Sequence, residues 1–233
     1  MKTKLTFLLA LTFLFLFSGS SVVFGDDFQD GWDAYQKQDY KTAHKLWLPL
    51  AEQGDASAQS ILGYMYSKGK GVLQDYKEAV RLYRLSAEQG DASAQVNLGF
   101  MYSKGQGVPQ DYKEAVRLYR LSAEQGFAKG QSNLGAMYQD GRGVLQHYKE
   151  AVKWFRLSAE QGHANAQQKL GVMYDQGKGV PQDYALAHMW WNICGSSGGK
   201  GCVKNRNRTE KEMTKQQIVQ AQELARNWKP TKK

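Results

Sequence analysis

A fifteen-residue segment occurs in five related copies at a constant interval along the chain. Tyr76–Gly90 and Tyr112–Gly126 have the same sequence, YKEAVRLYRLSAEQG, and looser copies begin at Tyr40, Tyr148 and Tyr184. Each copy starts 36 residues after the previous one. A fixed period of this length is typical of repeat architectures, in which each unit packs mainly against its neighbours.

Each period is expected to fold as two amphipathic helices. Within residues 91–126 apolar side chains recur at spacings of three and four, first over 91–105 and again over 112–126. Asp111 stands where a helix N-cap is expected, and Glu114 three residues later suggests a capping box. One such hairpin cannot bury its own apolar face. The pattern therefore predicts an all-α fold in which successive hairpins stack into a superhelix.

Glycines occupy two kinds of position in every period. Pairs of the form Gly-x-Gly-Val follow each first helix, and we interpret them as hairpin hinges because they lack the spacing of a phosphate-binding loop. Single glycines lie inside the first helix, where glycine costs about 1 kcal/mol relative to alanine. They are Gly63, Gly99, Gly135 and Gly171. We expect a close approach of the partner helix there, with nearby tyrosines packing against it, namely Tyr66, Tyr102, Tyr138 and Tyr174.

The N-terminus has the layout of a secretory signal peptide. Lys2 and Lys4 precede an apolar run over residues 5–17, and small residues follow. We predict a signal peptide over 1–25 with cleavage after Gly25, although cleavage after Ser20 is also compatible with the small residues there. An uncleaved membrane anchor is the alternative to a signal peptide. No cysteine in this segment could carry a lipid anchor. The expected location is therefore the periplasm or the medium, with no transmembrane helix in the mature protein.

The net charge of +9 is concentrated at the C-terminal end. Residues 26–199 contain nineteen basic and nineteen acidic residues, whereas residues 200–233 contain ten basic and three acidic ones. This end could contact an anionic envelope polymer or lipid surface, and for an exported protein we do not expect nucleic acid as a partner. A solvated helix without a partner explains the same charges equally well.

The repeat frame divides the chain into consecutive parts. After the signal peptide we expect an N-terminal capping hairpin, four repeats of 36 residues and a basic helical cap, which span 26–54, 55–90, 91–126, 127–162, 163–198 and 199–233. Thr214 and Gln217 predict the N-terminus of the last helix through a capping box, and Pro230 ends it.

The motif Ala-x-Ala-Gln-x-x-Leu-Gly-x-x-Tyr, followed by Gly-x-Gly-Val and Asp-Tyr-x-x-Ala, resembles the Sel1-like repeat, a relative of the tetratricopeptide repeat. The resemblance covers about residues 28–228. It implies a right-handed α-α solenoid with a C-terminal capping helix. It also implies a scaffold or adaptor that holds a protein or peptide in its concave groove.

Cys194 and Cys202 are the only cysteines, and in an oxidising compartment they favour a disulfide. In the repeat frame they occupy positions that face each other across a hairpin, although free or redox-active thiols remain an alternative. Metal binding is not expected, since two cysteines are too few ligands and the histidines lie in different repeats. The histidines are His44, His147, His163 and His188.

The seven intervening residues between the cysteines also resemble the spacing in a cysteine-rich branch of this family, which is described as penicillin-binding with weak β-lactamase activity. A weak hydrolase that acts on β-lactams is therefore the rival function. Ser67–Lys70 and Ser197–Lys200 fit Ser-x-x-Lys, but the other tripeptides of serine β-lactamases are absent. We therefore predict no catalytic residue and no cofactor.

Binding residues are sought where the repeats differ, because packing positions stay alike. The first helices vary at positions that the fold would place on the concave side. Asn97 and Asn133 could hydrogen-bond an extended peptide there, with Tyr64 and Phe100 as apolar contacts. The alternative is that these four are ordinary solvated or packing residues.

Overall fold

The computed structural model describes residues 24–231, and within them the chain forms twelve α-helices and one 3-10 helix, η1 (Glu210–Glu212), with no strand. The α-helices are α1 (Phe24–Gln36), α2 (Tyr40–Glu52), α3 (Ala56–Lys68), α4 (Tyr76–Glu88), α5 (Ala92–Lys104), α6 (Tyr112–Glu124), α7 (Ala128–Asp140), α8 (Tyr148–Glu160), α9 (Ala164–Gln176), α10 (Tyr184–Ser196), α11 (Lys200–Thr209) and α12 (Lys215–Asn227). The predicted signal peptide lies outside the described residues except for its last two positions.

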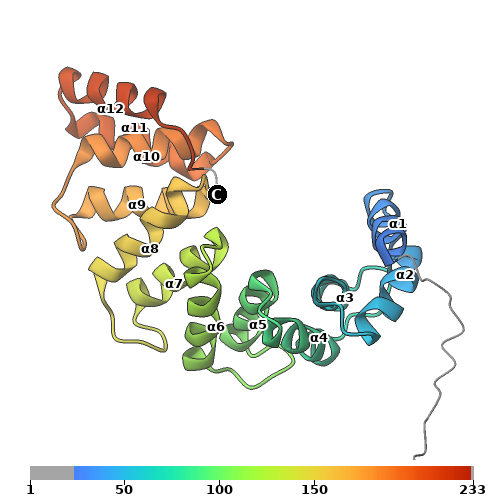
Figure 1. The fold of residues 1–233 in the computed structure, drawn as a ribbon. Coiled ribbons are helices and arrows are strands. Elements are labelled where there is room, and N and C mark those ends of the chain that lie inside the picture. Colours follow the sequence, from blue (N-terminus) through green and yellow to red (C-terminus); the bar gives the residue numbers. More distant parts are fainter. Residues whose placement is uncertain (1–23, 232–233) are drawn as a thin grey trace, which may run out of the picture.

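Consecutive helices pair into hairpins from α1–α2 to α9–α10, and the hairpins stack along a curved path. Figure 1 shows this solenoid running from α1 and α2 to α10–α12 at the other end. Helices α3, α5 and α7 also pack against their next-but-one neighbours, so they line the inner side of the curve, where successive hairpins approach most closely. None of the helices described here is long and apolar enough to span a bilayer.

Aspartates cap the N-termini of six of the twelve α-helices in the described chain, namely α2–α6 and α10. The carboxylate of Asp111 accepts hydrogen bonds from the amides of Lys113 and Glu114, at 2.8 and 3.1 Å. The predicted capping box is only half formed, because the Glu114 carboxylate pairs with Arg117 at 2.7 Å. Both halves of a capping box are present at the start of α12. Two inner helices, α7 and α9, have no side-chain cap.

The glycines inside the first helices confirm the predicted close approach of the partner helix. A Cβ on Gly135 would lie 2.8 Å from Cδ1 of Phe155, and one on Gly171 would lie 2.5 Å from Nε1 of Trp191. The predicted choice of tyrosines was wrong, because the covering rings come from the second helix of the same hairpin. These rings are Tyr83, Tyr119, Phe155 and Trp191.

The paired glycines form the hinge of each hairpin. Gly105 ends α5 in the left-handed conformation, with φ of 66°. Gly107 also has a positive φ, of 72°, and a Cβ there would overlap the backbone carbonyl of Tyr76 in the preceding hairpin. The second glycine therefore allows the loop to rest directly on the backbone of its neighbour.

Buried glutamines tie each hairpin to the one before it. Gln95 of α5 donates through Nε2 to the carbonyl of Ala87 in α4, at 3.4 Å, and its Oε1 accepts from Gln125, the residue after α6, at 2.9 Å. Gln59 and Gln131 make the same two kinds of bond. The buried apolar side chains form four clusters, which follow one another along the solenoid. Each cluster contains residues from neighbouring hairpins, as stacking requires.

The C-terminal helices are fixed to α10 by a covalent bond and by aromatic packing. The predicted disulfide between Cys194 and Cys202 is present, with a Cα–Cα distance of 5.9 Å, and joins α10 to α11. Both cysteines are buried. Trp228, just after α12, packs edge-on against Trp190 of α10, with 6.1 Å between ring centroids. The last helix thus covers a face of α10 that a further hairpin would otherwise cover.

Candidate functional site

All four predicted groove residues line one hollow on the inner side of the solenoid. Tyr64 of α3, Asn97 and Phe100 of α5, and Asn133 of α7 border a cavity of about 440 Å³. Tyr64 and Phe100 stand at the same position of successive first helices, as do Asn97 and Asn133, so the 36-residue period brings them together. Phe100 is 43% exposed, which is high for a phenylalanine and leaves its ring available to a ligand.

Two lysines that sequence reasoning missed also line this hollow. Lys68 ends α3 and Lys129 lies in the first turn of α7. Nζ of Lys129 lies 3.5 Å from Oδ1 of Asn97, a long hydrogen bond. Desolvation by the surrounding protein, followed by the positive charge of Lys68, lowers the pKa of Lys129, although its side chain is exposed overall. The two ammonium groups thus act on one cavity, and neither forms an ion pair within residues 24–231.

The signal for these lysines was present in the sequence. The position equivalent to Lys129 is serine in the two preceding repeats and asparagine in the next one. The position equivalent to Lys68 is lysine, aspartate and glutamine in the three later repeats. Both positions therefore vary as the four predicted groove positions do. The remaining lining is mixed, with Tyr76 and Tyr83 from α4 and with Gln74 and Gln106 from loops. Together these groups offer aromatic surface, amides and positive charge.

The first Ser-x-x-Lys match does not form a serine–lysine pair. The Ser67 hydroxyl donates to the carbonyl of Tyr64 at 2.8 Å. Nζ of Lys70 instead donates to the hydroxyl of Tyr35 at 2.9 Å and lies 4.7 Å from the ring centroid of Tyr40. The hydrogen bond to Tyr35 raises the pKa of Lys70, which is the opposite of what a catalytic base requires.

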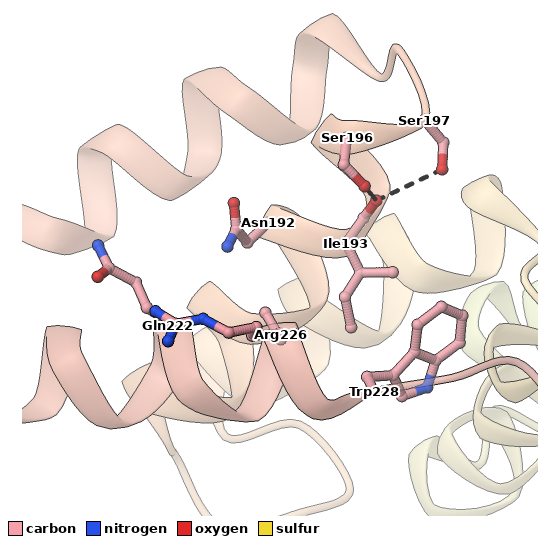
Figure 2. Close-up of a pocket in the computed structure, with 8 residues that line it drawn as sticks. Asn192, Ile193, Ser196, Ser197, Gln222, Arg226 and Trp228 are labelled. Atoms are coloured by element: carbon pink, nitrogen blue, oxygen red, sulfur yellow. Dashed lines mark hydrogen bonds between the residues drawn. The ribbon is translucent and has the colours of Figure 1, made fainter.

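A second hollow, of about 540 Å³, lies between α10 and α12 (Figure 2). Ser196 and Ser197, the latter from the second Ser-x-x-Lys match, both direct their hydroxyls to the carbonyl of Ile193, at 2.7 and 3.5 Å. Arg226 is the one cationic side chain that lines this hollow among residues 24–231, and Trp228 closes one end. Since its hydroxyls already have backbone partners, this hollow offers fewer groups to a ligand than the one on the inner side.

Part of the basic C-terminal end is neutralised within the fold. Arg208 pairs with Asp175 of α9 at 2.8 Å, and Arg206 lies 3.8 Å from Glu210. Glu210 also contacts the buried His188, at 2.7 Å. Lys211, by contrast, forms no ion pair within the described chain. In residues 24–231 no three His, Cys, Asp or Glu side chains gather in a way that could hold a metal ion.

The fold and the hollow together define a class of protein, an α-helical repeat solenoid with a ligand-sized groove on its inner face. Comparison with known families then gives the particular family. The Sel1 repeat profile matches residues 28–55, 56–91, 92–127, 128–163 and 164–193. The chain therefore belongs to the Sel1 repeat family, whose members generally act as scaffolds that bind other proteins. The first matched segment coincides with the hairpin α1–α2.

Solved structures of similar proteins have the same fold. A protective antigen of uropathogenic Escherichia coli that displays an SLR fold is 34% identical over 88% of this chain, with a TM-score of 0.83. The chain spans only 45% of that protein. A Sel1 repeat protein from Oxalobacter formigenes is 32% identical, with 87% of this chain and 83% of the other covered and a TM-score of 0.74. No curated protein matches the sequence.

Proposed function

We propose that this protein is an exported scaffold that binds a segment of another protein in the inner hollow bordered by Tyr64, Asn97, Phe100 and Asn133. The observation that carries the proposal is the convergence of these variable residues, from three successive hairpins, on one cavity. Asparagine amides can bond both the donors and the acceptors of an extended peptide backbone. The two aromatic rings supply the apolar contacts that commonly dominate binding energy at interfaces.

Export rests on the predicted signal peptide and is supported by the disulfide, which is typical of oxidising compartments. Expression of the whole chain with its own N-terminus, followed by sequencing of the mature protein from the periplasm, tests this part. A mature N-terminus at Asp26 is the expected result. Retention of residues 1–25 on a membrane-bound form would contradict it.

Site-specific photo-crosslinking in the native host tests the binding function. A benzoylphenylalanine at position 100 should capture a discrete partner, because Phe100 lies in the hollow. The matched control is position 85 on α4, since Leu85 is 37% exposed but does not line the hollow. Substitution of Asn97 and Asn133 by alanine should abolish the product at position 100. Equal capture at both positions, or indifference to the asparagines, would remove the support for a groove.

The rival function, weak hydrolysis of β-lactams, is tested on the same purified protein. We expect no turnover of a chromogenic cephalosporin, since Ser67 and Lys70 are each bonded elsewhere. Turnover that the substitution Ser67→Ala abolishes would instead identify an enzyme.

Attachment of the basic C-terminal end to an anionic envelope polymer is a second proposed role. It is supported by Lys211, Lys215 and Lys229, which have no ion-pair partner in the described chain. Deletion of α12 would expose α10, so the cleaner test replaces these three lysines by glutamine. Envelope association that persists unchanged in this variant would exclude the role.

A further inference from the structure

The inner hollow is the first of three neighbouring hollows that share lining residues. It shares Asn133 with a smaller hollow of about 140 Å³, which α5, α6 and α7 line. That hollow in turn shares Asp140 and Arg142 with a third, of about 420 Å³, which reaches α9 and the loop after it. Three hollows thus follow one another along four successive first helices. This row of adjoining hollows, which we call the groove, suits an extended chain better than a compact ligand.

The groove carries an excess of positive charge that the solenoid as a whole lacks. Its lining contains five cationic side chains and one carboxylate, and these cations are Lys68, Lys104, Lys129, Arg142 and Lys178. The carboxylate of Asp140 lies 3.8 Å from Arg142, so those two charges offset each other. The four lysines form no ion pair within the described residues. Residues 26–199 as a whole are balanced, with nineteen charges of each sign.

Two of the four lysines lie near the face of an aromatic ring. Nζ of Lys178 lies 5.7 Å from the ring centroid of Tyr148, and Nζ of Lys104 lies 5.9 Å from that of Phe100. A cation over an aromatic face keeps its charge and can still accept an anion on its open side. Lys129, whose pKa is lowered by desolvation and by Lys68, would regain stabilisation from an incoming carboxylate.

On these grounds, and resting on the proposed binding function, we propose that the groove takes an acidic, extended segment of its partner protein. Its Asp or Glu side chains pair with the lysines, an apolar residue between them packs on Tyr64 and Phe100, and its backbone bonds to Asn97 and Asn133. A nucleic acid fits less well. Its phosphates repeat at every nucleotide, whereas these cations are separated by neutral stretches and by Asp140.

Selection from a random dodecapeptide library, displayed on phage, tests the composition of the ligand without knowledge of the partner. The oxidised mature protein is the bait, and enriched peptides are synthesised for measurement of Kd by fluorescence anisotropy. We expect peptides rich in Asp and Glu around an apolar residue. Replacement of their acidic residues by Asn and Gln should weaken binding about tenfold, as should the double substitution Lys68→Gln and Lys129→Gln.

The control is the double substitution Lys77→Gln and Lys113→Gln, which removes two exposed lysines from the starts of α4 and α6, outside the groove, and should leave Kd unchanged. Circular dichroism checks that all variants stay folded. Neutral or basic binders that still need Tyr64 and Phe100 would overturn the inference and leave the proposed function standing. An absence of binders that need these rings would count against both. Displacement of the peptides by low concentrations of oligothymidylate would also overturn the inference, in favour of a nucleic acid.

Discussion

Removal of the disulfide is expected to loosen one end of the solenoid and leave the rest intact. Cys194 and Cys202 are eight residues apart in sequence. Closing a loop of that length lowers the entropy of the unfolded chain and so raises its free energy by about 2.5 kcal/mol at 25 °C. The double substitution Cys194→Ala and Cys202→Ala should therefore lower the free energy of unfolding of the C-terminal end by about that amount. The loss is local because each hairpin is stabilised mainly by its neighbours.

Hydrogen exchange read by mass spectrometry measures this effect by region. We expect faster exchange in α10, α11 and α12, which the bond and the packing of Trp228 hold together, and unchanged exchange in α4–α8. A reductant should reproduce the result in the wild type and have no further effect on the double variant. An equal loss of protection along the whole chain, or a change below about 0.5 kcal/mol at the C-terminal end, would refute the reasoning.

Three further predictions concern the inner helices. His163→Asp should raise the free energy of unfolding by about 1 kcal/mol in urea titrations, because aspartate would cap α9. It would also give the buried hydroxyl of Ser132, which has no partner within the described residues, an acceptor, as Asp91 does for the equivalent Ser60 at 3.1 Å. Burial, and secondly the charge of Lys129, lowers the pKa of His163, so the unfolded chain binds this proton at higher pH than the folded one. The free energy of unfolding should then fall as the pH drops below about 6.5. Urea midpoints measured at pH 7 and pH 5 test this, and the drop between them should be smaller in His163→Asn than in the wild type. Gly171→Ala should lower the melting temperature. Alanine gains about 1 kcal/mol of helix propensity, but its overlap with Trp191 costs about 1–3 kcal/mol. The same alanine substitution should cost less stability in a Trp191→Leu background, where the overlapping ring is gone.

The repeat period carried enough information to predict the fold and to place four residues of the candidate site together. Equivalent positions 36 residues apart must lie on equivalent faces, so the sequence alone predicts that Tyr64 and Phe100 lie on neighbouring helices with the same orientation. The period says nothing, however, about which neighbouring element covers a given position. For this reason a close approach at Gly135 was predicted correctly, but the ring that covers it, Phe155, was not.

The sequence shows that Lys68 and Lys129 occupy variable positions, but it does not show that they share one cavity. A lysine on an amphipathic helix is usually a solvated residue, and Lys68 and Lys129 are 61 positions apart. Only the curvature of the stack brings the end of α3 and the start of α7 to the same cavity. The position of successive hollows next to one another likewise depends on the conformation of the loops, which the repeated sequence does not predict.

The contact of Gly107 with the carbonyl of Tyr76 bears on how such a chain can change its length. The surface that each loop rests on is main chain, which is the same in every copy whatever the side chains are. A repeat inserted between two others could therefore make the same backbone contact with the hairpin on either side of it. The groove can therefore lengthen or shorten by whole repeats. The residues that line it can vary independently of the residues that pack one repeat against the next.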